Sequence, residues 1–166
     1  MSKFGNEDGS DHSKYSLFWA LENLIDLKTD SILLLSVGVL SAGTPCEYTA
    51  ATRNILNGDN EIKLERQQVE QEAKKIVSDG KVLIKNFIEA RGQEEDHVSV
   101  ECLVDSNSDP AKYIVALTKE KQVDVLVMGH RGTSSPGATD IGTVPQHCMH
   151  SAGCTVVITR KKKRTI

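Results

Sequence analysis

Two short runs of the sequence, Ile32–Leu40 and Val123–Met128, are apolar almost throughout. Such a run is typical of a parallel β-strand that is covered on both faces, because a strand with one face in water alternates apolar and polar residues. Apolar residues at helical spacing lie before, between and after these runs. The sequence therefore predicts an α/β fold, with an open parallel sheet and helices on both of its faces.

Strands and helices alternate along the whole sequence. In order, the pattern predicts a helix over about Asp11–Leu27, a strand over Ile32–Leu40, a long helix over Ile62–Ile88, a strand over Val98–Val104, a helix opened by Asp109 and Pro110, a strand over Val123–Met128, a short helix over Val144–Ser151 and a last strand over Thr155–Ile158. The strand Val98–Val104 alternates apolar and polar residues, which indicates a position nearer a sheet edge. Cys46–Asn60 shows no period and is expected to be a loop. The pair Asp79 and Gly80 can bend or split the long helix.

The composition limits the classes of function. A length of 166 residues fits one domain, and 39% hydrophobic with 26% charged residues indicates a globular chain. A net charge of -3 is too small to indicate a nucleic-acid partner. No apolar run approaches the length of a membrane span, and Met1–Ser10 is polar and lacks a signal core. We therefore expect a cytoplasmic protein without a membrane partner.

Cysteines and the carboxyl end add two smaller expectations. The four cysteines, Cys46, Cys102, Cys148 and Cys154, form no CxxC pair and are expected to be reduced, half-buried thiols. The domain is expected to cover residues 1–159. Residues 160–166 then form a basic tail, in which Arg160–Arg164 is either a solvated segment or a nuclear address.

Three glycines follow the second apolar strand at a distinctive spacing. Two residues separate Gly129 from Gly132, and nine more separate Gly132 from Gly142, which Thr143 follows. Glycines let backbone N–H groups approach phosphate oxygens, and the helix after Thr143 would direct its positive end at them. His130 and Arg131 could add positive charge. The alternative is that the first two glycines only turn the strand into a loop. Neither the P-loop nor the dinucleotide-binding glycine pattern is present.

This glycine run is similar to the ATP-binding signature of the universal stress protein family. Three further segments resemble that family: Asp8–Ser13 at its first strand end and helix start, Asp109-Pro110 before its fourth strand, and Asp124–Ile158 as its carboxyl half. The resemblance implies an adenine nucleotide alpha hydrolase-like sheet of five parallel strands in the order 3-2-1-4-5. It also implies ATP, with a divalent cation such as Mg²⁺ on its phosphates, and a homodimer formed through the last strand, Thr155 to Ile158.

The resemblance also assigns roles to residues of the nucleotide site. The implied binding residues are Asp8, Val37, Met128, Gly129, Gly132, Gly142, Thr143 and Val144, and Arg131 is expected to join them because of its positive charge. Asp8 would contact the ribose or adenine side, Val37 would meet adenine through its backbone, and Met128 would pack against the nucleoside. The glycines, Thr143 and Val144 would hold ribose and phosphates. A carboxylate accepts hydroxyl hydrogen bonds well, yet Asp8 followed by Gly9 can equally be a simple turn.

Three functions remain open on these residues. The first is a nucleotide-binding regulatory module in stress response, without assigned catalytic or metal-binding residues. The second is a slow ATPase or nucleotidyl-transferring enzyme, although the sequence holds no Walker lysine and no obvious general base beside the loop. The third is a dimerisation scaffold that has lost its nucleotide. His147 and His150 lie three residues apart and could share a metal, but surface or dimer-face positions fit them better because no third ligand lies nearby.

The amino terminus departs from the family pattern. The family's first strand is apolar, central in the sheet, and ends at the aspartate that corresponds to Asp8. Here Met1–Glu7 contains only Met1 and Phe4 as large apolar side chains, whereas a central strand should be almost continuously apolar. We expect a short or irregular first strand that leaves the second and fourth strands poorly bridged and Asp8 loosely held.

Replacing Met1–Glu7 with the apolar strand Lys-Ile-Val-Val-Ala-Val should therefore raise the melting temperature and tighten nucleotide binding. The physical reason is that a strand with two apolar faces would bury surface on both sides of the sheet. Thermal unfolding and calorimetric titration measure the two effects. A replacement that changes neither quantity, in a protein whose own first strand is full-length and central, would contradict this expectation.

Overall fold

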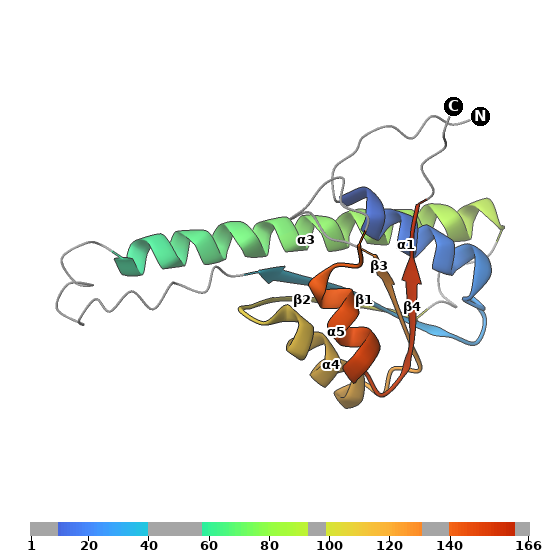
Figure 1. Ribbon diagram of the computed structural model, residues 1–166. Coiled ribbons are helices and arrows are strands. Elements are labelled where there is room, and N and C mark those ends of the chain that lie inside the picture. The colour runs from blue at the N-terminus through green and yellow to red at the C-terminus, as the bar shows by residue number, and fades with distance from the viewer. Residues whose placement is uncertain (1–9, 40–57, 93–98, 131–139, 162–166) are drawn as a thin grey trace, which may run out of the picture.

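The computed structural model describes residues 10–39, 58–92, 99–130 and 140–161. Its elements are α1 (Ser10–Asn23), β1 (Ser31–Val39), α3 (Gly58–Ala90), β2 (Ser99–Asn107), α4 (Pro110–Glu120), β3 (Val125–Gly129), α5 (Thr143–Ser151) and β4 (Thr155–Thr159). The predicted alternation of helices and strands is confirmed (Figure 1). Within the described ranges, no helix contains a stretch long and apolar enough to cross a lipid bilayer.

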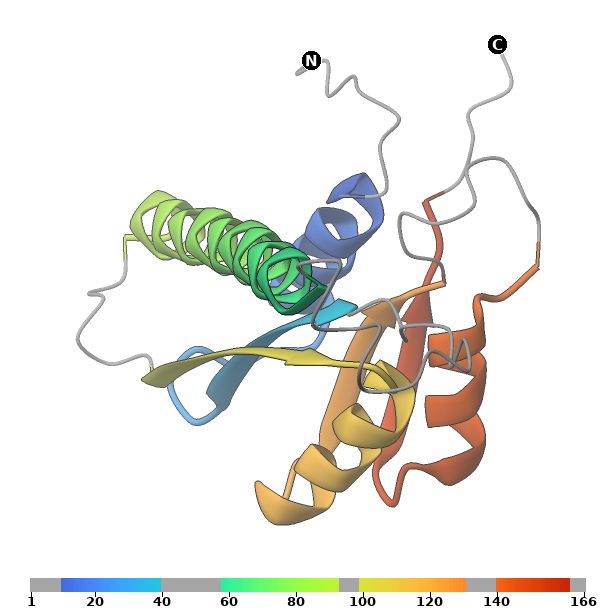
Figure 2. The ribbon, with the colours of Figure 1, turned by 90° about the vertical axis from the view of Figure 1, so that its left-hand side faces the viewer.

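The described strands form two parallel pairs. β1 pairs with β2, in a register that places Ser31 beside Ser99, and β3 pairs with β4, with Val125 beside Thr155. α1 and α3 pack on one side of these strands, while α4 and α5 lie on the other side (Figures 1 and 2). The expected α/β class, with helices on both faces of parallel strands, is therefore confirmed.

The expected five-stranded order 3-2-1-4-5 is only partly present. The pairs β2–β1 and β3–β4 are those that this order places on either side of its first strand. No strand in the described ranges joins β1 to β3. The segment expected to form the joining strand, which ends at Asp8, lies outside the described residues. The structure thus shows the two outer strand pairs as separate sheets.

Burial along the strands differs from what their composition predicts. β1 and β3 contain the apolar runs expected to be covered on both faces, yet most of their residues are only half-buried. Each of these strands has one described neighbour, so part of its apolar surface lies at an open edge. β2 pairs with β1 alone, and its alternating pattern correctly predicted a place near an edge. Strand composition alone therefore overestimated the burial of β1 and β3.

The main hydrophobic core lies between α1, α3 and β1. Its buried members are Leu21, Leu27, Ile32, Ile84 and Ile88, and the partly buried Leu17, Ile25, Leu34, Phe87 and Val100 pack against them. An ion pair between Lys14 and Asp79 links the two helices across the rim of this core, at 3.3 Å. Both charged side chains are nearly half exposed, so the pair contributes little beside the apolar contacts. Apolar packing therefore fixes α1 and α3 on the strands.

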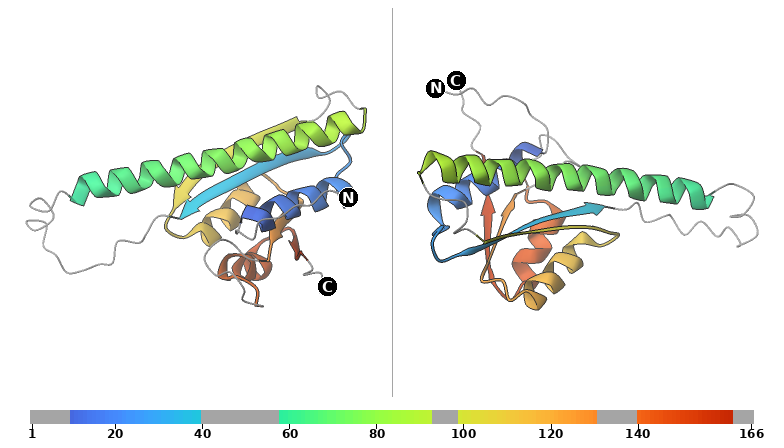
Figure 3. Two further views of the ribbon diagram at one scale, coloured as in Figure 1. Left: turned by 90° about the horizontal axis from the view of Figure 1, so that it is seen from above. Right: turned by 180° about the vertical axis from the view of Figure 1, so that it is seen from behind.

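α3 is one continuous helix, so the bend expected at Asp79 and Gly80 is wrong. Gly80 is buried, and a Cβ atom there would come within 2.7 Å of Leu34 Cδ2. The glycine therefore lets the helix approach β1 closely and does not interrupt it. The helix also begins at Gly58, where a loop was expected, and its amino-terminal part runs past the ends of the strands (Figure 3).

α4 begins as the sequence predicts. Asp109 is its N-cap residue and accepts a hydrogen bond from the Lys112 backbone N–H at 3.2 Å, with Pro110 in the first turn. The side-chain hydrogen bond from Lys112, and then its backbone hydrogen bond, lower the pKa of the Asp109 carboxyl. Because a carboxylate accepts more strongly than a carboxylic acid, this charge favours the cap. The Asp-Pro pair thus marks a helix start for a local physical reason.

At Gly38, as at Gly80, a neighbouring residue lies too close to leave room for a side chain. A Cβ atom at Gly38 would overlap Val69 of α3, and it would lie 3.3 Å from the Val69 carbonyl oxygen. We predict that Gly38→Ala destabilises the protein by about 1–3 kcal/mol, because the stiff, branched valine and its backbone must move. Denaturant unfolding measures the effect.

Gly153→Ala is the matched control, since nothing lies within 4 Å of the added atom. Its unfolding midpoint should stay near the wild-type value. Equal stability of the two variants would show that α3 does not pack tightly on β1.

Candidate functional site

The base of the glycine loop is fixed by one residue. His130, which directly follows β3, donates its backbone N–H to the Thr159 carbonyl at 2.9 Å. Its carbonyl accepts the N–H of Gly142 at 2.8 Å. Residues 131–139, which connect these two ends, lie outside the described residues. The end of β3, the end of β4 and the start of α5 are therefore held together at this point.

The first turn of α5 has no side-chain cap. Gly142 is the N-cap residue, with φ -66° and ψ 160°, and as a glycine it makes no side-chain cap hydrogen bond. The helix was expected to begin at Val144, but Thr143 is its first residue, and the Thr143 side chain is exposed. The first turn also contains no acidic residue. Within this turn, no acidic side chain neutralises the partial positive charge of the helix start.

Glycine suits position 142 because it has no side chain, and not because of its backbone conformation. Its φ lies in the ordinary extended region, which any residue can adopt. The useful property is the missing Cβ, which leaves the N–H groups of the first turn open to an approaching oxyanion. This geometry is typical of phosphate sites at helix starts.

The structure brings some of the predicted site residues together. Met128 and Gly129 end β3, half-buried, opposite Ile158 and Thr159 of β4. Gly142, Thr143 and Val144 follow at the start of α5, with Val144 half-buried. The hydrogen bond from Gly142 to His130 joins the two groups. Five of the predicted residues therefore surround one loop base.

The other predicted residues are placed differently. Val37 lies in β1 beside Asp105 of β2, in the other sheet, and no described hydrogen bond links it to the loop base. Asp8, Arg131 and Gly132 lie outside the described residues. Among the described residues, Met128 is therefore the nucleoside-side residue that lies at the loop base.

His130 has a different environment from the one expected. The sequence suggested that its charge would face a phosphate. Instead its side chain is only 7% exposed, and its ring packs edge-to-face on His12 of α1, with ring centroids 4.7 Å apart. The imidazole lies in the interior against α1. His130 therefore holds the loop base through its backbone N–H and carbonyl groups.

Two hydroxyl residues behind the loop were missed by the sequence reasoning. Ser16 Oγ and Thr159 Oγ1 lie 2.7 Å apart and are buried, although 143 positions separate them in the sequence. Ser16 Oγ also donates to the His12 carbonyl at 2.7 Å. One signal could have found Ser16: it lies four residues before the buried Ala20, so it is a polar residue on the core-facing side of α1.

Cysteine and histidine side chains nearby do not form a second site. Cys148 of α5 is fully buried, while Cys102 and Cys154 are half-buried, and all three are free thiols. Burial raises the pKa of the Cys148 thiol, and the neighbouring Cys154 raises it further, so the thiol stays protonated near neutral pH. His147 is half-buried and His150 is exposed. The described residues include no group of three or more potential ligands that could hold a metal ion.

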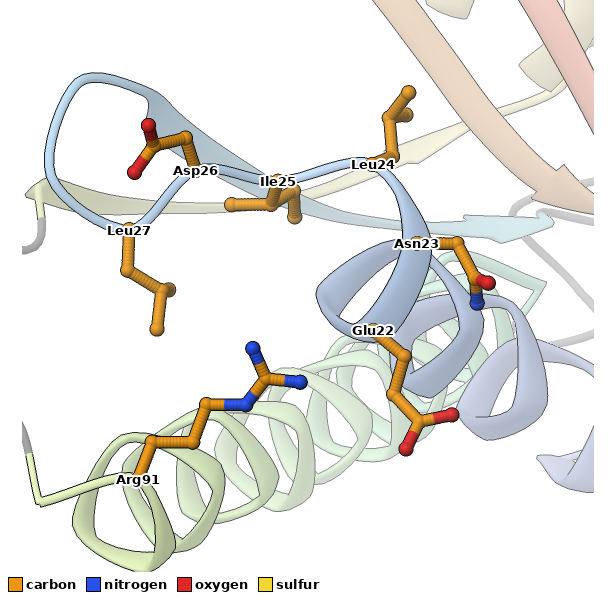
Figure 4. Close-up of a pocket in the computed structure, with 7 residues that line it drawn as sticks. All are labelled: Glu22, Asn23, Leu24, Ile25, Asp26, Leu27 and Arg91. Atoms are coloured by element: carbon orange, nitrogen blue, oxygen red, sulfur yellow. The ribbon is translucent and has the colours of Figure 1, made fainter.

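A shallow pocket lies elsewhere, beside the amino end of β1. It is lined by Glu22, Asn23, Leu24, Ile25, Asp26, Leu27 and Arg91, from the ends of α1 and α3 and the segment after α1 (Figure 4). The Arg91 guanidinium lies over the Phe87 ring, 4.5 Å from its centroid. The glycine loop instead follows the carboxyl end of β3. The pocket is therefore separate from the loop base.

Two solved structures support the fold. The hypothetical protein MJ0577, studied for structure-based assignment of biochemical function, is 17% identical, with a TM-score of 0.57 over 94% of this chain and 91% of that chain. Universal stress protein UspA from Lactobacillus plantarum is 14% identical, with a TM-score of 0.54 over 93% and 92%. A universal stress protein in complex with cAMP is 19% identical, with a TM-score of 0.43 over 93% of each chain.

A search of curated proteins gave no match. The model of the universal stress protein family matches residues 8–160, which include every strand and helix described above. The chain belongs to the universal stress protein family.

Proposed function

We propose that this protein binds ATP at the loop base formed by Gly129, His130 and Gly142, and acts as a regulatory nucleotide-binding module. The observation that carries the proposal is the uncapped start of α5, held directly beside the end of β3 by the hydrogen bond from Gly142 to His130. In the sequence, the glycine run lies between these two points.

The phosphate groups would lie against the first turn of α5. The backbone N–H groups of Thr143 and Val144 have no side-chain acceptor in the cap residue, and no acidic residue opposes an anion in that turn. Pro145, the third residue of the helix, has no N–H. A helix start favours negative charge by about 0.3–1 kcal/mol at an exposed site, and direct N–H hydrogen bonds add to that. The exposed Thr143 hydroxyl is available as a further donor. A divalent cation would accompany the phosphates and balance the remaining charge.

The nucleoside would lie toward the strand ends. Met128 is half-buried immediately before Gly129, where its flexible side chain can pack against a sugar or base. The family resemblance supports Asp8 as a hydroxyl acceptor and the Val37 backbone as an adenine contact. Arg131 and Gly132 would complete the loop around the phosphates. ATP would be bound without rapid hydrolysis, because the sequence offers neither a Walker lysine nor an evident base beside the loop. A cytoplasmic location fits this role.

A valine at Gly142 or Gly132 should weaken ATP binding at least about tenfold, or about 1.4 kcal/mol. The branched side chain would occupy the space through which phosphate oxygens reach the backbone N–H groups. Isothermal titration calorimetry with ATP and Mg²⁺ measures the affinity.

Gly153→Val is the matched control, because Gly153 lies beyond the end of α5 and nothing would lie within 4 Å of its Cβ. This variant should bind ATP as the wild type does. If Gly142→Val also kept the wild-type affinity, the loop base would have no role in binding.

We also propose a homodimer formed through the open edge of β4. Among the described strands, β4 pairs only with β3, and its β-branched residues favour further pairing. Thr155 donates its N–H to Asp124, on the β3 side, and Thr159 accepts there from His130. The backbone N–H and C=O groups of successive residues point to opposite edges of a strand. Those of Val157 therefore also point toward β3, whereas those of Val156 and Ile158 point toward the open edge.

Val156→Pro should therefore weaken dimerisation while leaving the monomer folded, because it removes a donor on the open edge. Val157→Pro should instead lower the melting temperature, because it removes a donor of the β3–β4 pair. Sedimentation equilibrium and thermal unfolding separate the two effects. A wild-type protein that stays monomeric at high micromolar concentration would refute the dimer.

A further inference from the structure

A continuous series of hydrogen bonds connects α1 to the start of α5. We name its members, His12, Ser16, Thr159, His130 and Gly142, the α1–α5 network. The Ser16 hydroxyl contacts the His12 carbonyl and the Thr159 hydroxyl, at 2.7 Å each. The Thr159 carbonyl accepts the His130 N–H, and the His130 carbonyl accepts the Gly142 N–H. Four different elements or their ends therefore meet in one network.

The direction of the buried hydroxyl contacts follows from their hydrogens. A hydroxyl group has one hydrogen to donate. The His12 carbonyl can only accept, so Ser16 donates to it, and Thr159 must then donate to Ser16. Thr159 thus uses its side chain toward α1 and its backbone carbonyl toward His130. It is the member at which the α1 side and the loop side of the network join.

The imidazole rings of His12 and His130 form a second contact between α1 and the network. His12 lies one helical turn before Ser16 in α1, and its ring meets the buried ring of His130 at an interplanar angle of 80°. The His130 backbone therefore cannot move away from Thr159 without also moving its ring on His12. The hydroxyl contact thus connects α1 to Thr159, and the ring contact connects α1 to His130, which accepts the Gly142 N–H.

We propose that Thr159, Ser16, His12 and His130 are positioning residues for the phosphate side of the nucleotide site. They would act through Gly142, by holding the start of α5 at the end of β3, without touching the ligand. This role rests on the proposed function. It predicts a selective effect: loss of the network should weaken contacts to phosphates much more than contacts to the nucleoside. A purely structural role would lower stability and leave that selectivity unchanged.

The test compares ATP with adenosine as ligands, by calorimetry. Thr159→Val keeps the shape and the β-branch of the side chain and removes the donor to Ser16. We expect an ATP affinity about fivefold lower or more, since a buried hydroxyl loses its partner, and an adenosine affinity within about twofold of the wild type. Thr159→Ser restores the hydroxyl and should restore ATP binding. Ser13→Ala removes an exposed hydroxyl from the same helix and is the matched control.

A measurement without ligand accompanies the titrations. The Gly142 amide is hydrogen-bonded to His130, so its hydrogen exchange reports how firmly α5 is held. Exchange at Gly142 should be faster in Thr159→Val than in Thr159→Ser, in proteins whose thermal unfolding shows that both are folded.

Four results would overturn the proposal. They are unchanged ATP affinity in Thr159→Val, an equal loss of ATP and adenosine, a loss in Thr159→Ser as large as in Thr159→Val, and unchanged Gly142 exchange. A wild-type protein that binds no ATP would instead refute the proposed function, and with it the role in positioning phosphates. Faster Gly142 exchange in that case would still show that Thr159 controls the start of α5.

Discussion

The candidate site depends on two backbone hydrogen bonds of a single residue. His130 donates to Thr159 and accepts from Gly142, and these bonds join the ends of two strands to the start of a helix. Without them, the helix start would be an ordinary exposed terminus, and the glycines would only be a flexible connection. With them, the uncapped N–H groups of α5 have a fixed place relative to β3, as electrostatic stabilisation of an anion requires. The buried ring of His130 stabilises this arrangement because it packs on α1.

The loop base and Val37 lie in different parts of the fold. α1 packs on β3 and β4, and α5 packs on α4 and β4, so the loop base has neighbours on both faces. β1, which contains Val37, belongs to the other sheet, and its apolar residues are mostly half-buried. A strand between β1 and β3 would bury both open edges and would bring Val37 into the same sheet as Met128. Binding energy for the phosphates and for the base therefore depends on different parts of the fold.

The sequence predicted the elements well because its local signals were strong. Asp109 and Pro110 mark the start of α4, and apolar runs mark β1 and β3, through interactions that involve only neighbouring residues. The sequence could not predict features that depend on distant partners. Ser16 and Thr159 meet only because α1 packs on β4, and Gly80 continues a helix because Leu34 of another element packs against it. The start of α5 was misplaced by one position, because Thr143 and not Val144 is the first helical residue.

The central claim is that an anion of a nucleotide binds at the start of α5. Titration of isotope-labelled protein with ATP and Mg²⁺, followed by the backbone amide signals, tests it most directly. The account predicts the largest shifts at Gly142, Thr143 and Val144, with Gly129 also affected, and little change at Gly153. Shifts concentrated at Leu24 to Leu27 and Arg91, which line the pocket beside β1, would contradict it, as would a spectrum that ATP leaves unchanged.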